Sequence, residues 1–102
     1  MSIVVTGATG HLGRLIVEDL LAHGLPAEEI TATGRRVERI ADLAERGVRV
    51  VAADLEDPAT LRAAFAGADT LMLVSGSEFG RRLPQHVNAI EAARAEGVRR
   101  VV

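Results

Sequence analysis

Short apolar runs and longer amphipathic stretches alternate along the whole chain. Five runs are rich in β-branched residues, and the first and fourth are apolar nearly throughout, as is typical of strands covered on both faces. The runs are residues 3–6, 30–33, 48–52, 70–74 and 98–102. Four stretches between them have the apolar spacing of an amphipathic helix. Their predicted buried stripes are Leu12, Leu15, Ile16 and Leu20; Val37, Ile40, Ala41 and Ala44; Leu61, Ala64, Phe65 and Ala68; and Leu83, Val87, Ile90 and Ala93.

Glycine and proline mark the predicted ends of these helices. A glycine follows each helical stretch, where it ends a helix in the left-handed conformation at little steric cost. These glycines are Gly24, Gly47, Gly67 and Gly97. Asp57 and Pro58 supply an N-cap and a first-turn proline for the third helix. Pro84 fits only the first turn of the fourth helix, which should therefore begin near residues 81–83.

The alternation of strands and helices predicts the fold class. It is typical of an α/β fold with a parallel sheet and right-handed crossovers. We predict a doubly wound parallel sheet, the Rossmann fold, in three αβα layers with strand order 3-2-1-4-5. We expect one domain over residues 1–102. Because the sequence stops inside the predicted fifth strand, we expect the N-terminal portion of a longer protein, or a truncated chain.

Composition removes several kinds of chemistry. The chain contains no Cys, and all 12 basic residues are Arg, which excludes thiol nucleophiles, lysine Schiff bases and a Walker-type lysine. The net charge of −2 and the presence of only two aromatic residues, both Phe, argue against nucleic-acid binding. No pair of His or carboxylate residues has metal-ligand spacing. No apolar run reaches membrane-spanning length and no signal peptide is evident, so we expect no membrane association and a cytoplasmic location.

A glycine-rich turn directly follows the first predicted strand. Its three glycines allow a sharp turn, a close approach of the backbone to a pyrophosphate, and close packing of the helix on the sheet, in that order. The helix N-terminus offers N–H groups and a positive dipole end to the phosphates. A turn that serves packing alone is the alternative, and His11 is either a donor to the pyrophosphate or a tolerated variable side chain. The candidate cofactor-binding residues are Gly7, Ala8, Thr9, Gly10, His11, Leu12 and Gly13.

Arginine stands where a dinucleotide-binding fold recognises the adenosine ribose. That position lies about 20 residues past the glycine motif, where an acid binds the 2′-OH of NAD and an Arg accommodates the 2′-phosphate of NADP. Here Arg35 follows Gly34, which we expect to leave space for the ribose. Arg39, one predicted helical turn further, is a second candidate. A solvated pair of arginines is the alternative, but the pattern predicts a preference for NADP(H) over NAD(H).

The ends of the third and fourth predicted strands supply further candidates. Asp54 would accept a hydrogen bond from the adenine amino group while Leu55 lines the adenine slot; an ordinary loop before the Asp57 cap is the alternative. Val74, Ser75 and Gly76 lie at the carboxyl edge of the sheet, where ligands bind in open α/β folds. Their small side chains would leave room for the nicotinamide end of the cofactor.

Taken together, these residues resemble one family. The turn from Thr6 to Gly13, Arg35, and Ala53-Asp54 look like those of atypical short-chain dehydrogenase/reductases. The segment Ser75-Gly76-Ser77-Glu78-Phe79-Gly80-Arg81, with Gln85-His86-Val87-Asn88, resembles the NmrA-like group that includes NADPH-dependent quinone oxidoreductases. The likeness runs along the whole chain.

The resemblance implies hydride transfer from NADPH to a quinone or a similar small-molecule acceptor. It also implies cofactor contacts from residues 7–12, Arg35, Arg39 and residues 74–76, and a substrate pocket built largely by segments after the fifth strand. The catalytic residues are therefore unknown. The Tyr-x-x-x-Lys pair of ordinary short-chain dehydrogenases is excluded, because the chain has neither residue type. An NADP-sensing regulator without turnover is the alternative, and association into a homo-oligomer is left open.

Overall fold

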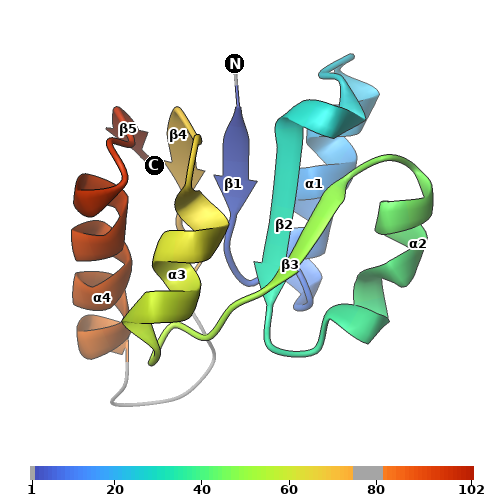
Figure 1. Ribbon diagram of the computed structural model, residues 1–102. Coiled ribbons are helices and arrows are strands. Elements are labelled where there is room, and N and C mark those ends of the chain that lie inside the picture. Colours follow the sequence, from blue (N-terminus) through green and yellow to red (C-terminus); the bar gives the residue numbers. More distant parts are fainter. Residues whose placement is uncertain (1, 75–81) are drawn as a thin grey trace.

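The computed structural model describes residues 2–74 and 82–102. Within them, five parallel strands form one sheet in the order β3-β2-β1-β4-β5, which confirms the predicted topology (Figure 1). All five strands run in the same direction, so their carboxyl ends share one edge of the sheet, the lower edge in Figure 1. The strands are β1 (Ile3–Val5), β2 (Ile30–Gly34), β3 (Arg49–Ala52), β4 (Thr70–Met72) and β5 (Arg100–Val101).

The helices follow the predicted order, with two differences: the 3-10 turn η1 (Ala27–Glu29) was not predicted, and the second helix is not α-helical throughout. The second predicted helix is a 3-10 turn, η2 (Val37–Ile40), that continues into a short helix, α2 (Ala41–Glu45). The remaining helical elements are α1 (His11–Ala22), α3 (Pro58–Phe65) and α4 (Arg82–Ala95). None of the helices in the described ranges is both long enough and apolar enough to cross a bilayer.

Two apolar clusters hold the helices against opposite faces of the sheet. On one face, Val17 of α1 and Leu43 of α2 are buried with Val5, Ile30 and Ala32 of the strands. On the other face, residues of α3 and α4 are buried with Val4 and Leu71. The result is the three-layer αβα arrangement (Figure 1).

The helix ends confirm the signals in the sequence. All four glycines that follow helices have positive φ, for example +97° at Gly47. The Asp57 carboxylate accepts a hydrogen bond from the Ala59 N–H at 3.2 Å, and Pro58 is the first residue of α3. Helix α4 begins at Arg82, so Pro84 lies in its first turn. Local chemistry therefore decides where these helices start and stop.

The predicted buried face is correct for α3 and only partly correct for the other helices, where Ile40 and Ala93 are buried and Ile16 and Leu20 are half-buried against the core, as predicted. All four apolar residues of the predicted α3 stripe are buried. In α1 the buried residues are Gly13 and Val17, while Leu12 and Leu15 are exposed. In η2 and α2 they are Ile40 and Leu43, while Ala41 and Ala44 are exposed.

The correction is largest in α4. Of the predicted stripe, Ala93 is buried, Val87 and Ile90 are exposed, and the side chain of Leu83 lies outside the described residues. The other residues that the helix turns inward are Gln85, Ala89 and Ala92. Small side chains let this helix lie close to α3 and to the sheet, so close packing decides its orientation more than side-chain hydrophobicity does.

Candidate functional site

The glycine-rich turn lies at the carboxyl edge of the sheet, between β1 and α1. Gly7 has φ of +65°, which a residue with a side chain adopts only with strain, and it accepts a hydrogen bond from the Gly10 N–H at 3.0 Å. Gly10 is the N-cap of α1. The first turn of α1 contains no acidic residue, and no side chain among the described residues caps it. The first N–H groups of α1 and its positive dipole end are thus arranged to receive an anion.

The glycines at positions 10 and 13 have different roles. The sequence predicts that Gly13 lets the helix pack closely on the sheet. A Cβ built on Gly13 would instead lie 2.1 Å from the Gly7 carbonyl oxygen, so this glycine lets α1 pack against its own turn. Among the described residues, a Cβ on Gly10 would meet only the Gly7 oxygen, at 3.4 Å. Gly10 is exposed, as are His11 and Leu12 beside it. No described residue therefore fills the space in front of Gly10, and a ligand could lie there.

The turn is fixed to the end of β2. The Ala8 N–H donates to the Thr33 carbonyl oxygen at 2.8 Å, and the Thr9 side chain packs over Gly34. A Cβ on Gly34 would lie 2.6 Å from Thr9 Cγ2 and 2.7 Å from Thr9 Oγ1. This corrects the expectation that Gly34 leaves space for a ribose: the space is filled by Thr9, and Gly34 lets the turn and β2 approach each other.

The turn is also fixed to the chain that follows β4. The Thr6 hydroxyl, which is buried, accepts a hydrogen bond from the Val74 N–H at 2.9 Å. A Cβ on Gly7 would lie 3.3 Å from the Val74 carbonyl oxygen. Val74 therefore adjoins the glycine turn, as a shared ligand site requires. The other two candidates in this segment, Ser75 and Gly76, lie outside the described residues.

Both candidate arginines are exposed and follow β2. Arg35 comes directly after Gly34, and therefore next to the point where Thr9 contacts β2. Arg39 lies in η2, a 3-10 turn, and not in the α-helical turn that the sequence predicts. Both residues belong to the segment that joins the end of β2 to α2, at the same edge of the sheet as the glycine turn (Figure 1).

The loop after β3 is held by its own hydrogen bonds and by α4. The Asp54 carboxylate accepts from the Glu56 N–H at 2.9 Å, and the Asp54 N–H donates to the Thr60 hydroxyl at 2.9 Å. Leu55 is half-buried against the core, and its carbonyl oxygen accepts from Asn88 Nδ2 at 2.9 Å. Asp54 thus has a local role in shaping this loop in addition to the adenine contact predicted for it.

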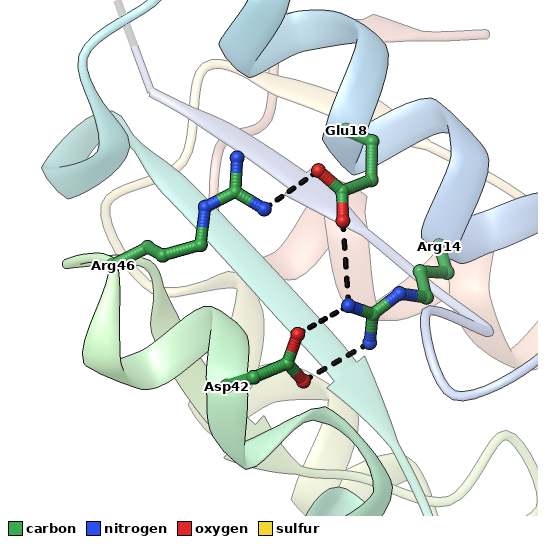
Figure 2. Close-up of polar contacts among 4 residues, drawn as sticks. All are labelled: Arg14, Glu18, Asp42 and Arg46. Carbon is green, nitrogen blue, oxygen red and sulfur yellow. Dashed lines mark hydrogen bonds and ion pairs between the residues drawn. The ribbon is translucent and has the colours of Figure 1, made fainter.

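A chain of alternating charges joins α1 to α2, and the sequence patterns do not indicate it. The Arg14 guanidinium makes two hydrogen bonds to the Asp42 carboxylate, one of them from Nη1 to Oδ1 at 3.1 Å (Figure 2). Glu18 accepts from Arg14 Nη2 at 3.3 Å and from Arg46 Nη1 at 2.6 Å. We call Arg14, Glu18, Asp42 and Arg46 the α1–α2 ion-pair chain.

These contacts shift the titration of both acids. The hydrogen bond from Arg14 lowers the pKa of Asp42, and the hydrogen bond from Arg46 lowers the pKa of Glu18. All four side chains are between 35% and 52% exposed, so salt in the solvent screens the attraction. These ion pairs therefore contribute little to the stability of the fold, and their main effect is to fix the orientation of α2 relative to α1.

The structure brings most of the predicted site together. The turn, the end of β2 and Val74 are in direct contact, and the Arg35–Arg39 segment and the Asp54–Leu55 loop lie at the same edge. In the part of the chain that the structure describes, no group of three His, Asp or Glu residues could hold a metal ion. The site offers N–H donors and a helix dipole to phosphates, and two exposed arginines, Arg35 and Arg39, follow the neighbouring strand.

Comparison with known proteins agrees with this arrangement. Residues 7–102 match a protein family described as NAD(P)H-binding. Quinone oxidoreductase 2 of Escherichia coli is 44% identical over 97 residues, which cover 95% of this chain and 34% of that protein. An NmrA-like family domain-containing oxidoreductase of Aspergillus flavus is 32% identical over 105 residues, covering 99% of this chain and 34% of that protein.

A solved structure shows the same fold. Triphenylmethane reductase of a Citrobacter species, in complex with NADP(H), superposes with a TM-score of 0.91 at 43% identity, over 99% of this chain and 36% of that one. The present chain thus spans about a third of the length of these relatives. The matched family, the identities and the shared fold agree with the glycine turn and its setting: this chain belongs to the NAD(P)H-binding, NmrA-like family of oxidoreductases.

Proposed function

We propose that the site at the carboxyl edge of the sheet binds NADP(H) in preference to NAD(H). The observation that carries cofactor binding is the open N-terminus of α1, where, among the described residues, a Cβ on Gly10 would meet one backbone oxygen and where the first turn has no acid. The proposed preference rests on Arg35 and Arg39, which follow β2 at the same edge. An anionic diphosphate fits such a site because it accepts hydrogen bonds from backbone N–H groups. The NADP(H) complex of the triphenylmethane reductase supports the choice of cofactor.

Each part of the site would contact a different part of the cofactor. Residues 7–12 would hold the diphosphate, and Arg35, with Arg39, would bind the 2′-phosphate through charge-assisted hydrogen bonds. Asp54 and Leu55 would contact the adenine. Val74, Ser75 and Gly76 would adjoin the nicotinamide end, because Val74 contacts the turn.

We further propose that the protein reduces a quinone or a related conjugated acceptor. NADPH supplies a hydride when bound, and a quinone that accepts the hydride takes one proton from water or from an acidic group to become a hydroquinone. The names of the Escherichia coli and Citrobacter relatives support acceptors of this conjugated kind. The chain's contribution is to bind and orient the cofactor at the sheet edge.

Titration of the protein with NADPH and with NADH tests the cofactor proposal. A charge-assisted hydrogen bond contributes roughly 1.5–3 kcal/mol, so wild-type protein should prefer NADPH on the order of 10- to 150-fold, and Arg35→Asp should abolish the preference. Arg99→Asp makes the same change of charge at an exposed position next to β5 and should leave the preference intact. Equal affinities for the two cofactors in wild-type protein would refute the assignment.

Steady-state oxidation of NADPH with a panel of quinones tests the reaction. Turnover supports the reductase, and the panel identifies the acceptor class. Tight NADPH binding without turnover of any quinone would instead support an NADP-sensing regulator that responds to the cofactor without consuming it.

A further inference from the structure

Arg14 is placed to connect two parts of the cofactor site. It is the fourth residue of α1, and its N–H donates to the Gly10 carbonyl oxygen at 3.0 Å, so it belongs to the helical turn that follows the glycines. Its guanidinium reaches across to Asp42, which lies 28 residues later in the sequence, in the first turn of α2 (Figure 2).

Helix α2 holds the far end of the arginine-bearing segment. The chain leaves β2 at Gly34, passes through Arg35 and Arg36, forms η2 and continues directly into α2. The near end of the segment is fixed by the contacts of Thr33 and Gly34 with the glycine turn. The position of α2 therefore decides where Arg39, and the backbone that carries Arg35, lie relative to the turn.

Apolar packing alone fixes α2 weakly. The helix has only five residues, too few to be stable by itself, and it buries Leu43, with Ile40 just before it. Apolar contacts have no preferred direction, so a short helix can roll or slide on them. A guanidinium that binds both oxygens of one carboxylate is directional, because its two parallel hydrogen bonds fix distance and orientation together.

We propose that the Arg14–Asp42 ion pair is a positioning device that holds the Arg35–Arg39 segment beside the glycine turn and so contributes to the choice of NADP(H) over NAD(H). The proposal rests on the proposed function of the site. Neither Arg14 nor Asp42 is assigned a contact with the cofactor, and both act through the segment between β2 and α2. Glu18 and Arg46 add a second link, at the end of α2 that lies farther from the segment.

The test measures the ratio of the dissociation constants for NADH and NADPH by calorimetric titration. Asp42→Ala removes the carboxylate, Arg14→Gln removes the cation and keeps much of the stem, and a third protein carries both changes. Complete loss of the 2′-phosphate contact would lower the preference for NADPH on the order of 10- to 150-fold. A misplaced segment loses only part of this contact, so each single variant should lower the ratio about 3- to 10-fold. Because the two residues act as a unit, the double variant should be no worse than either single one.

Arg62→Gln is the matched control. It breaks a surface ion pair, from Arg62 Nε to Glu96 Oε2 at 3.3 Å, between α3 and the residue that follows α4, on the opposite face of the sheet. This change should leave the ratio unaltered. Far-ultraviolet circular dichroism verifies the fold of every variant. The two single substitutions lie in different helices, so if one variant misfolds, the other still tests the ion pair.

The outcomes separate the inference from the function on which it rests. The positioning role is overturned if folded Asp42→Ala and Arg14→Gln keep the wild-type ratio of dissociation constants, whether or not both cofactors bind more weakly, while Arg35→Asp still abolishes the preference. An unchanged ratio in Arg35→Asp itself overturns the proposed phosphate recognition. A reduced ratio in both single variants, with no further loss in the double variant, supports the proposal.

Discussion

At the scale of single residues, two glycines three positions apart perform separate tasks. Gly13 has no room for a side chain, because a Cβ would lie 2.1 Å from a backbone oxygen of Gly7. Gly10 has room, but that room faces the place proposed for the diphosphate. Folding and binding can therefore be separated by changing one glycine at a time.

We expect Gly13→Ala to destabilise the fold and Gly10→Ala to weaken cofactor binding. Forcing a methyl group into a packed site costs about 1–3 kcal/mol, so Gly13→Ala should lower the denaturation midpoint. Gly10→Ala should lower the midpoint less, because alanine is a poorer N-cap than glycine but meets no close contact among the described residues, and it should lower the affinity for NADPH and NADH alike. Chemical denaturation and calorimetric titration of both variants measure the two effects. A Gly10→Ala protein that binds NADPH as tightly as the wild type would contradict the proposed diphosphate position.

At the scale of elements, patterns along the chain predicted order and boundaries well. Strand and helix order, the helix-ending glycines and the Asp57 cap all depend on residues near each other in sequence, and all are confirmed. The glycine turn was predictable for the same reason. The buried faces of α1 and α4 were predicted only in part, because each helix carries more than one apolar side and the packing partners decide which is used.

Contacts between distant residues had no signal in the sequence. Arg14 and Asp42 are ordinary exposed charges until the fold places α1 beside α2. The filling of the space over Gly34 by Thr9 likewise depends on the approach of two elements. Such contacts become visible only when the three-dimensional arrangement is known.

The α1–α2 ion-pair chain predicts how stability changes with pH. The pKa values of Asp42 and Glu18 are lowered in the folded protein, so the unfolded chain binds more protons in the acid range. Their contribution is present above the ordinary carboxyl pKa values of about 4 and is lost as the pH falls through the lowered ones. In low salt, the thermal midpoint should fall less steeply between about pH 5 and pH 3 in an Asp42→Asn, Glu18→Gln variant than in the wild type. Identical slopes in the two proteins would show that these pairs add nothing to stability.

At the scale of the whole molecule, cofactor binding should stabilise the fold. Two strands and a helix meet at the proposed site, since the turn contacts the end of β2 and the chain after β4. A ligand that bridges them binds only the folded state. The single domain, the cytoplasmic location and the absence of nucleic-acid partners stay predictions from the sequence.

We expect NADPH to raise the thermal midpoint more than NADH does at the same concentration. A ligand at 100 times its dissociation constant stabilises the folded state by about 2.7 kcal/mol, and a ligand that binds more weakly stabilises it less. Differential scanning fluorimetry with an external dye measures the shift, and the Arg35→Asp variant provides the control in which the two cofactors should act alike. Larger stabilisation by NADH would contradict the proposed preference.

The packing of Thr9 on Gly34 restricts how the cofactor preference could be redesigned. The usual route towards NAD places an acidic side chain at the end of the second strand. At position 34, a Cβ alone would already lie 2.6 Å from the Thr9 methyl carbon and 2.7 Å from its hydroxyl oxygen. A longer acidic side chain would need the volume that these two groups occupy. A compensatory trimming of residue 9 would have to accompany the new acid, so these two positions should be exchanged as a pair.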